Sequence, residues 1–181
     1  VGTEAVLSLV EARASWTFSG LGAEPVPSLL RGFSAPVRLS DELSDDDLAF
    51  LMGHDDDPFN RWEAGQRLAV RVVLAGVDAL RAGREVSVPE GFIRAFGLTL
   101  DAGDLDGRYR ALALSLPDFT YLGEQMVEID VDRLHASREA VVRVLAQRHR
   151  TAFASAWSTL APEGPYRNDG TSIARRALRN A

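Results

Sequence analysis

The residues with the greatest capacity for chemistry are clustered in the stretch HDDD, which runs from His54 to Asp57. An imidazole followed by three carboxylates offers the ligand types that divalent metals bind. Helical metal sites, however, usually take ligands three or four residues apart on one face, with further ligands from a second element. These four residues are adjacent and lie between a glycine and a proline, a pattern typical of the join between two helices. We therefore do not interpret these residues as metal ligands. Asp57 is interpreted as a helix cap, and Asp55 and Asp56 lie near the positive end of the helix dipole.

The remaining histidines and the known catalytic motifs give no further site. His135 and His149 are fourteen positions apart in a predicted helix, which puts them about 20 Å apart and too far to bind one ion. The sequence contains no His-Glu-x-x-His, Gly-x-Ser-x-Gly or Gly-x-x-x-x-Gly-Lys motif, and no Gly-x-Gly-x-x-Gly motif after a strand. We therefore assign no catalytic, cofactor-binding or metal-binding residue to this chain.

One cationic cluster is compatible with anion binding. The run SIARRALRN places Arg175, Arg176 and Arg179 close together on a predicted helix, and guanidinium groups pair well with carboxylates and phosphates. Cations near the C-terminal end of a helix are an equally good interpretation, because the helix dipole favours positive charge there.

Bulk composition limits the class of protein. The chain has 181 residues, of which 46% are apolar and 25% charged, as in ordinary globular proteins. A net charge of −6 argues against a general nucleic-acid partner. The absence of cysteine excludes disulfides and thiolate zinc sites. No apolar run approaches the ~20 residues needed to cross a membrane, so we expect neither a nucleic-acid nor a membrane partner.

The N-terminal part of the sequence predicts β-strands. The stretches AVLSLVEA, ASWTFSGL and RGFSAPVRL are rich in apolar residues or alternate between apolar and polar ones. Three such strands bury only one face of a sheet and need a partner layer. They could form a small sheet on the helices that follow, or the end of a β-sandwich whose other strands precede Val1. We favour the second interpretation.

The rest of the sequence predicts helices joined by short connections. Capping residues, prolines and glycines indicate helices over approximately these ranges: 44–53, 57–83, 89–97, 104–117, 118–126, 131–160 and 171–181. In the second helix, Gly65, Ala69 and Gly76 thin the apolar stripe enough for a neighbouring helix to approach closely. Short connections favour stacked αα-hairpins, and no strict repeat is visible. We therefore expect a mainly α fold, an irregular helical-repeat superhelix or bundle, preceded by a few strands of an immunoglobulin-like sandwich.

The chain also resembles a known family. PVPSLLRGFSAPVRL, followed by LSDDDLAFLMGHDDDPFNRWEAGQ, resembles the C-terminal half of bacterial aminopeptidase N, a zinc metallopeptidase of the gluzincin type. ALALSLPD, YLGEQM and RRALRNA are similar to that family in the same order, so the resemblance extends from about Val6 to Ala181. In this family a β-sandwich follows the catalytic domain, and a helical-repeat domain follows the sandwich. The resemblance implies that residues 1–39 are the terminal strands of an incomplete sandwich domain and residues 40–181 the first part of an incomplete helical-repeat domain.

The same resemblance implies a role without catalysis. The family's zinc ligands lie in a His-Glu-x-x-His helix and a downstream glutamate, neither of which can be carried onto this sequence. The whole protein is therefore expected to be a cytoplasmic zinc aminopeptidase. In it, this part is expected to bind no zinc, to be inactive alone, to cap the catalytic cleft and to restrict peptide access. Its partners would be the catalytic and β-sandwich domains of its own longer chain and, through them, peptide substrates. The alternative is a freestanding helical-repeat module that binds a protein or peptide.

Overall fold

The chain is built from helices in a computed structural model that describes residues 4–162 and 164–181. A short 3-10 turn, η1 (Arg31–Phe33), precedes the first α-helix. Eight α-helices follow in the described residues: α1 (Asp45–His54), α2 (Pro58–Arg81), α3 (Glu90–Asp101), α4 (Gly107–Leu114), α5 (Phe119–Glu124), α6 (Val131–Arg148), α7 (Arg150–Thr159) and α8 (Gly170–Asn180). The mainly α fold expected from the sequence is confirmed.

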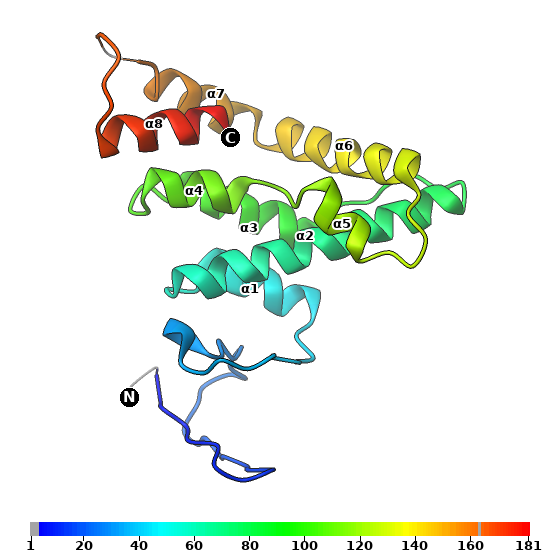
Figure 1. The fold of residues 1–181 in the computed structure, drawn as a ribbon, viewed down its shortest axis with the longest axis vertical. Coiled ribbons are helices and arrows are strands. Elements are labelled where there is room, and N and C mark those ends of the chain that lie inside the picture. Colours follow the sequence, from blue (N-terminus) through cyan, green and yellow to red (C-terminus); the bar gives the residue numbers. More distant parts are fainter. Residues whose placement is uncertain (1–3, 163) are drawn as a thin grey trace.

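The helices are stacked in layers along the long axis of the molecule (Figure 1). An extended N-terminal segment lies at one end, α1 and α2 follow, α3, α4 and α5 come next, and α6, α7 and α8 lie at the other end. The main contacts join α1 to α2 and α3, α2 to α6, and α4 to α8. None of the helices in the described part of the chain is both long enough and apolar enough to cross a membrane.

The core lies where α1, α2, α3, α5 and α6 meet. Its side chains that are almost completely buried include Leu48, Leu68, Val73, Phe92, Leu122 and Val141. Small residues on α2 allow this packing, as expected from the sequence. The hydroxyl group of Ser137 on α6 donates to the Val73 carbonyl at 2.7 Å, and Gly76 leaves room for that contact. A Cβ atom at Gly76 would overlap the Ser137 hydroxyl oxygen.

Most predicted helix starts are confirmed. Ser44 and Asp47 form a capping box at the start of α1, with reciprocal side-chain to backbone hydrogen bonds. Asp57 caps α2 and Pro58 occupies its first position. Asp118 caps α5 through the Tyr121 amide.

Three predicted boundaries were wrong, and in two of them a tertiary contact overrides the local signal. α3 continues past Gly97 to Asp101. Gly97 serves close packing instead, since a Cβ atom there would lie 2.6 Å from the imidazole of His149. The helix predicted over 131–160 is interrupted at His149, whose φ of −110° and ψ of 20° are not helical. The imidazole of His149 lies 2.9 Å from the Ile93 carbonyl, which fixes the break.

The third error concerns the start of α4. Asp106, and not Asp104, caps this helix, because its carboxylate accepts hydrogen bonds from the amides of Arg108 and Tyr109. Asp104 belongs to the preceding loop.

The N-terminal strands are not formed in the described residues. Residues 4–30 have no regular secondary structure, and large apolar side chains such as Val6, Trp16 and Phe18 are exposed. A strand requires a neighbour that accepts its ladder hydrogen bonds, and no such neighbour is present in the described part of the chain. The apolar alternation in this segment is therefore left without a covering layer.

Replacing Gly76 by Ala should destabilise the α2–α6 contact. The added methyl group would overlap the Ser137 hydroxyl, and overpacking of this kind costs about 1–3 kcal/mol. Urea unfolding followed by circular dichroism measures the change in the free energy of unfolding. Gly103→Ala is the matched control, since a Cβ atom at Gly103 would have open space around it; equal losses in both variants would contradict the proposed contact.

Candidate functional site

The most elaborate polar arrangement joins the N-terminal segment to the corner between α1 and α2. Arg31 donates to Asp55 Oδ1 from Nη1 at 2.7 Å and to the Asp56 carboxylate from Nη2. The amide of Gly32 donates to Asp57 Oδ2 at 3.0 Å. All three carboxylates of the HDDD stretch are therefore directed at residues 31–32, and we call this arrangement the Arg31 joint.

Asp55 is the most deeply buried member of the Arg31 joint. Its side chain is only 1% exposed, and Oδ1 also accepts a hydrogen bond from the Asp57 amide at 2.9 Å. Asp55 Oδ2 and the hydroxyl of Tyr109 are buried without a hydrogen-bond partner in the described part of the chain. Because a buried carboxylate is costly unless its charge is compensated, Asp55 depends on Arg31.

The other two carboxylates are held in their charged form. The hydrogen bond from Arg31 lowers the pKa of Asp56, and the positive charge of Arg31 adds to the effect. Burial raises the pKa of Asp57, but hydrogen bonds from the amides of Asn60, Gly32 and Phe59 outweigh it, so the net shift is downward. Asp57 thus caps α2 and binds the N-terminal segment with the same carboxylate.

The backbone at the Arg31 joint has an uncommon conformation. Leu30, Gly32 and Phe33 have φ values of 56°, 60° and 56°, and a left-handed conformation costs a non-glycine residue about 1–2 kcal/mol. The side-chain amide of Asn60 stabilises it by donating to the Leu29 carbonyl at 2.8 Å. The ring of Phe33 packs on Phe59 with centroids 4.5 Å apart.

A second ion pair fixes the segment at its other end. Arg67 on α2 holds Asp41 through two hydrogen bonds, of 2.8 and 2.6 Å, and the Asp41 side chain is only 10% exposed. This hydrogen bonding lowers the pKa of Asp41 despite its partial burial. Residues 31–41 are therefore tied at two points, to the α1–α2 corner through Arg31 and to α2 through Asp41.

The residues of the HDDD stretch do not fit a zinc ion. His54 is exposed, and its ring packs on Phe50 with centroids 5.0 Å apart. Asp55, Asp56 and Asp57 face Arg31 and backbone amides. Among the residues with described positions, no group of three histidine, cysteine or acidic side chains is placed to hold a metal ion.

The other histidines make packing contacts. His135 stacks on Phe119 with centroids 5.6 Å apart. His149 stacks on Phe96 at 5.8 Å, in addition to its contact with the Ile93 carbonyl.

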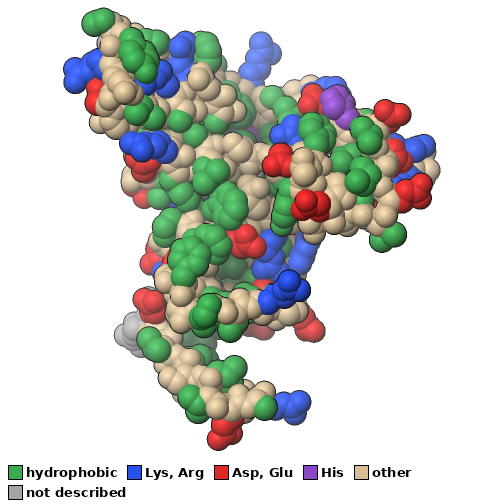
Figure 2. All heavy atoms as spheres, viewed as in Figure 1, with side chains coloured by type: hydrophobic (Ala, Val, Ile, Leu, Met, Phe, Trp, Pro, Cys, Tyr) green, Lys and Arg blue, Asp and Glu red, His purple; other side chains and the backbone are tan. Residues whose placement is uncertain are grey.

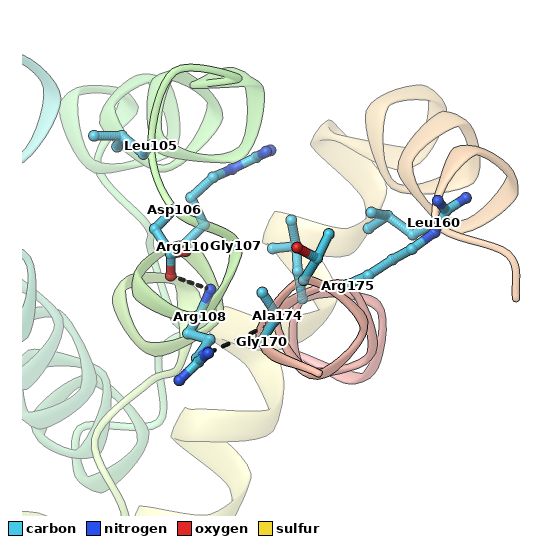
Figure 3. Close-up of a pocket in the computed structure, with 11 residues that line it drawn as sticks. Leu105, Asp106, Gly107, Arg108, Arg110, Leu160, Gly170, Ala174 and Arg175 are labelled. Atoms are coloured by element: carbon cyan, nitrogen blue, oxygen red, sulfur yellow. Dashed lines mark hydrogen bonds between the residues drawn. The ribbon is translucent and has the colours of Figure 1, made fainter. Parts of the chain in front are cut away.

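Arg108, Arg110 and Arg175 border a hollow between α4 and α8 (Figure 3), and two of them bind the ends of other helices. The hollow measures about 530 Å³. Arg175 donates to the Thr159 carbonyl at 2.6 Å, at the end of α7. Arg110 donates to the Leu100 carbonyl near the end of α3. These cations bind the carbonyl ends of helices, where the dipole favours positive charge.

The remaining arginines of the C-terminal run pack on aromatic rings. The Arg176 guanidinium lies 4.6 Å from the centroid of Tyr166, and that of Arg179 lies 3.7 Å from the centroid of Trp157. These cation–π contacts attach α8 to α7 and to the connection between them. The run SIARRALRN thus has a structural role in helix packing.

The stacked helices of residues 45–181 are those of an armadillo-type helical-repeat domain. Residues 45–181 match the family described as a domain of unknown function, DUF3458_C, ARM repeats, and the chain belongs to this family. Residues 1–42 match the neighbouring family described as DUF3458, Ig-like fold.

Several relatives of the chain are aminopeptidases. The chain is 33% identical over 97% of its length to aminopeptidase N of Escherichia coli and 36% identical over 99% to that of Caulobacter vibrioides. A crystal structure of Legionella pneumophila aminopeptidase A in complex with aspartic acid superposes on 90% of the chain, with a TM-score of 0.72 and 27% identity. The chain spans about a fifth of the length of each relative. The predicted relationship to the C-terminal part of bacterial aminopeptidase N is confirmed.

Replacing Arg31 by Met should lower stability at neutral pH by about 2 kcal/mol, because it leaves the buried Asp55 charge without its partner. The carboxylates of Asp56 and Asp57 have lowered pKa values. The stabilisation that these two charged carboxylates give the folded state is therefore complete above the ordinary carboxyl pKa of about 3.9. It is lost as the pH falls through their lowered pKa values. The difference between wild type and variant should shrink below about pH 4.

Urea unfolding across this pH range, with hydrogen exchange of the Gly32 amide, measures both effects. Arg38→Met is the matched control, since Arg38 lies in the same segment and is exposed. A loss in Arg31→Met that stays constant far below the ordinary carboxyl pKa would contradict a role for the charged carboxylates.

Proposed function

We propose that this chain is a non-catalytic part of a zinc-dependent aminopeptidase. The observation that carries the proposal is the similarity to aminopeptidase N over 97–99% of the chain. The sequence lacks the His-Glu-x-x-His motif of the zinc site, and the side chains of the three aspartates in the HDDD stretch are occupied by the Arg31 joint. The zinc ion and the reacting groups would belong to the remainder of a longer cytoplasmic protein.

In that longer protein, the helical layers would cap the catalytic cleft and restrict entry to peptides. The Arg31 joint supports this proposal, because a cap needs a defined orientation relative to the part it covers. Two ion pairs hold residues 31–41 against the α1–α2 corner and α2. The segment before them would continue into a sandwich domain. The Arg31 joint would then transmit the position of the sandwich to the helices.

The purified chain should not hydrolyse aminoacyl-nitroanilides, with or without added zinc. Release of nitroaniline measured by absorbance tests this expectation. Chelator-sensitive turnover by the purified chain would overturn it.

The capping role predicts a selective effect in the full-length protein. Arg31→Met should loosen the orientation of the helical domain and raise kcat/KM for long peptides about two- to tenfold, within the range that changes of this energy produce. The kcat/KM of the variant for a small aminoacyl-nitroanilide should stay within about twofold of the wild-type value, because a small substrate reaches the catalytic cleft without restriction. Arg38→Met serves as control. Equal changes for long and small substrates would contradict restricted access.

A further inference from the structure

Large apolar side chains are exposed where α5 meets α6. This region, residues 119–132, is called the α5–α6 corner below. Val127 is fully exposed and Val131 is 69% exposed, while Phe119, Tyr121 and Ile129 are each more than 40% exposed. Contiguous exposed apolar side chains of this kind mark interaction surfaces in folded proteins.

A hollow lies between this corner and the end of α2. Its volume is about 740 Å³, and its lining includes Leu74 and Val77 from α2 and Met126 from the connection between α5 and α6. Asp78 and Asp132 border it on the α2 and α6 sides. The lining of the hollow therefore mixes apolar side chains, among them Val127 and Val131, with carboxylates and one cation, Arg81.

The charge around this surface is mainly negative, although Arg81 also lines the hollow and Arg138 lies over the ring of Phe119. Residues 111–132 contain five acidic residues and no basic residue. Asp130 is paired with Arg133 at 2.7 Å and lies 3.6 Å from Arg81. By contrast, Glu124, Glu128 and Asp132 make no ion pair with any described residue and are exposed. On the lobe formed by α5 and the start of α6, Figure 2 shows hydrophobic side chains with acidic ones beside them.

We propose that the α5–α6 corner is a docking surface for a polypeptide partner that presents apolar residues flanked by lysine or arginine. The apolar side chains of the partner would enter the hollow and cover Val127 and Val131. Its cations would pair with Glu128 and Asp132 at the rim, where charge complementarity contributes to specificity and to the rate of association.

The negative charge of the α5–α6 corner also argues against a second copy of this chain, a nucleic acid or an anionic membrane as the partner. In a symmetric contact between two copies of this chain, the same patch faces itself, so acidic residues would oppose acidic residues. Nucleic acids and anionic membrane surfaces would be repelled for the same reason. The docking surface does not depend on the proposed catalytic context, since it consists only of residues of α2, α5, α6 and the connection between the last two.

The test uses the 181-residue chain and a synthetic peptide of alternating lysine and leucine, monitored by amide chemical shifts in nuclear magnetic resonance. We expect saturable shift changes concentrated at residues 125–132. Two control peptides should each bind at least about tenfold more weakly. A peptide of alternating lysine and serine lacks the apolar side chains, and a peptide of alternating glutamate and leucine lacks the cations. Equal binding of the lysine–serine peptide would overturn the apolar part of the proposal.

Matched variants separate this surface from the general acidity of the chain. Val127→Ser with Val131→Ser, and separately Glu128→Gln with Asp132→Asn, should each weaken binding about tenfold. Two controls remove the same side-chain types from the exposed N-terminal segment: Val6→Ser with Val10→Ser, and Glu11→Gln with Glu24→Gln. An equal loss in the controls would overturn the proposal. Self-association through residues 125–132, detected by sedimentation and by shifts that depend on protein concentration, would overturn it in favour of a second copy.

Discussion

The turn at residues 30–33 is held against the helices largely by its contact with one buried carboxylate. Asp55 is held almost completely out of water at the corner between α1 and α2, and its compensating cation comes from a residue 24 positions earlier in the chain. Such a charge is tolerated only when its partner is in place. Leu30 and Phe33 adopt a left-handed conformation beside Arg31, and this strain is the conformational cost of bringing Arg31 to Asp55. Asp57 and Asn60 offset this cost with hydrogen bonds to the same turn.

The spacing of the helical layers also depends on glycines at close helix contacts, of which three are examples. Gly65 faces Met52, Gly76 faces Ser137 and Gly97 faces the imidazole of His149. At Gly76 and Gly97 a side chain from outside the glycine's own helix occupies the volume that a Cβ atom would need, and at Gly65 the Met52 side chain lies 3.3 Å from that position. These contacts join α1 to α2, α2 to α6, and α3 to the break between α6 and α7. Without them the layers would have to move apart, because packed interiors leave no unused space.

The features that could be predicted from the sequence are those encoded locally. The caps at Ser44, Asp57 and Asp118 were predictable because a cap involves residues within one turn. Capping also accounts for the aspartates of the HDDD stretch without a metal ion. Long-range partners were not predictable in the same way. Nothing in the spacing of Arg31 indicated that it would meet Asp55, and the break at His149 depends on a carbonyl 56 residues away.

The N-terminal stretches alternate between apolar and polar residues as strands do, but a sheet also needs neighbours, which the described residues do not supply. Residues 31–41 are bound firmly to the helices, whereas the segment before them exposes its apolar side chains.

The choice of cation in this structure has one last consequence. Every ion pair found among the described residues uses arginine, and the chain contains no lysine. A guanidinium group keeps its proton well beyond the pH at which an ammonium group is neutralised. The electrostatic contacts of this fold are consequently suited to persist in strongly alkaline solution, where lysine-based pairs would be lost.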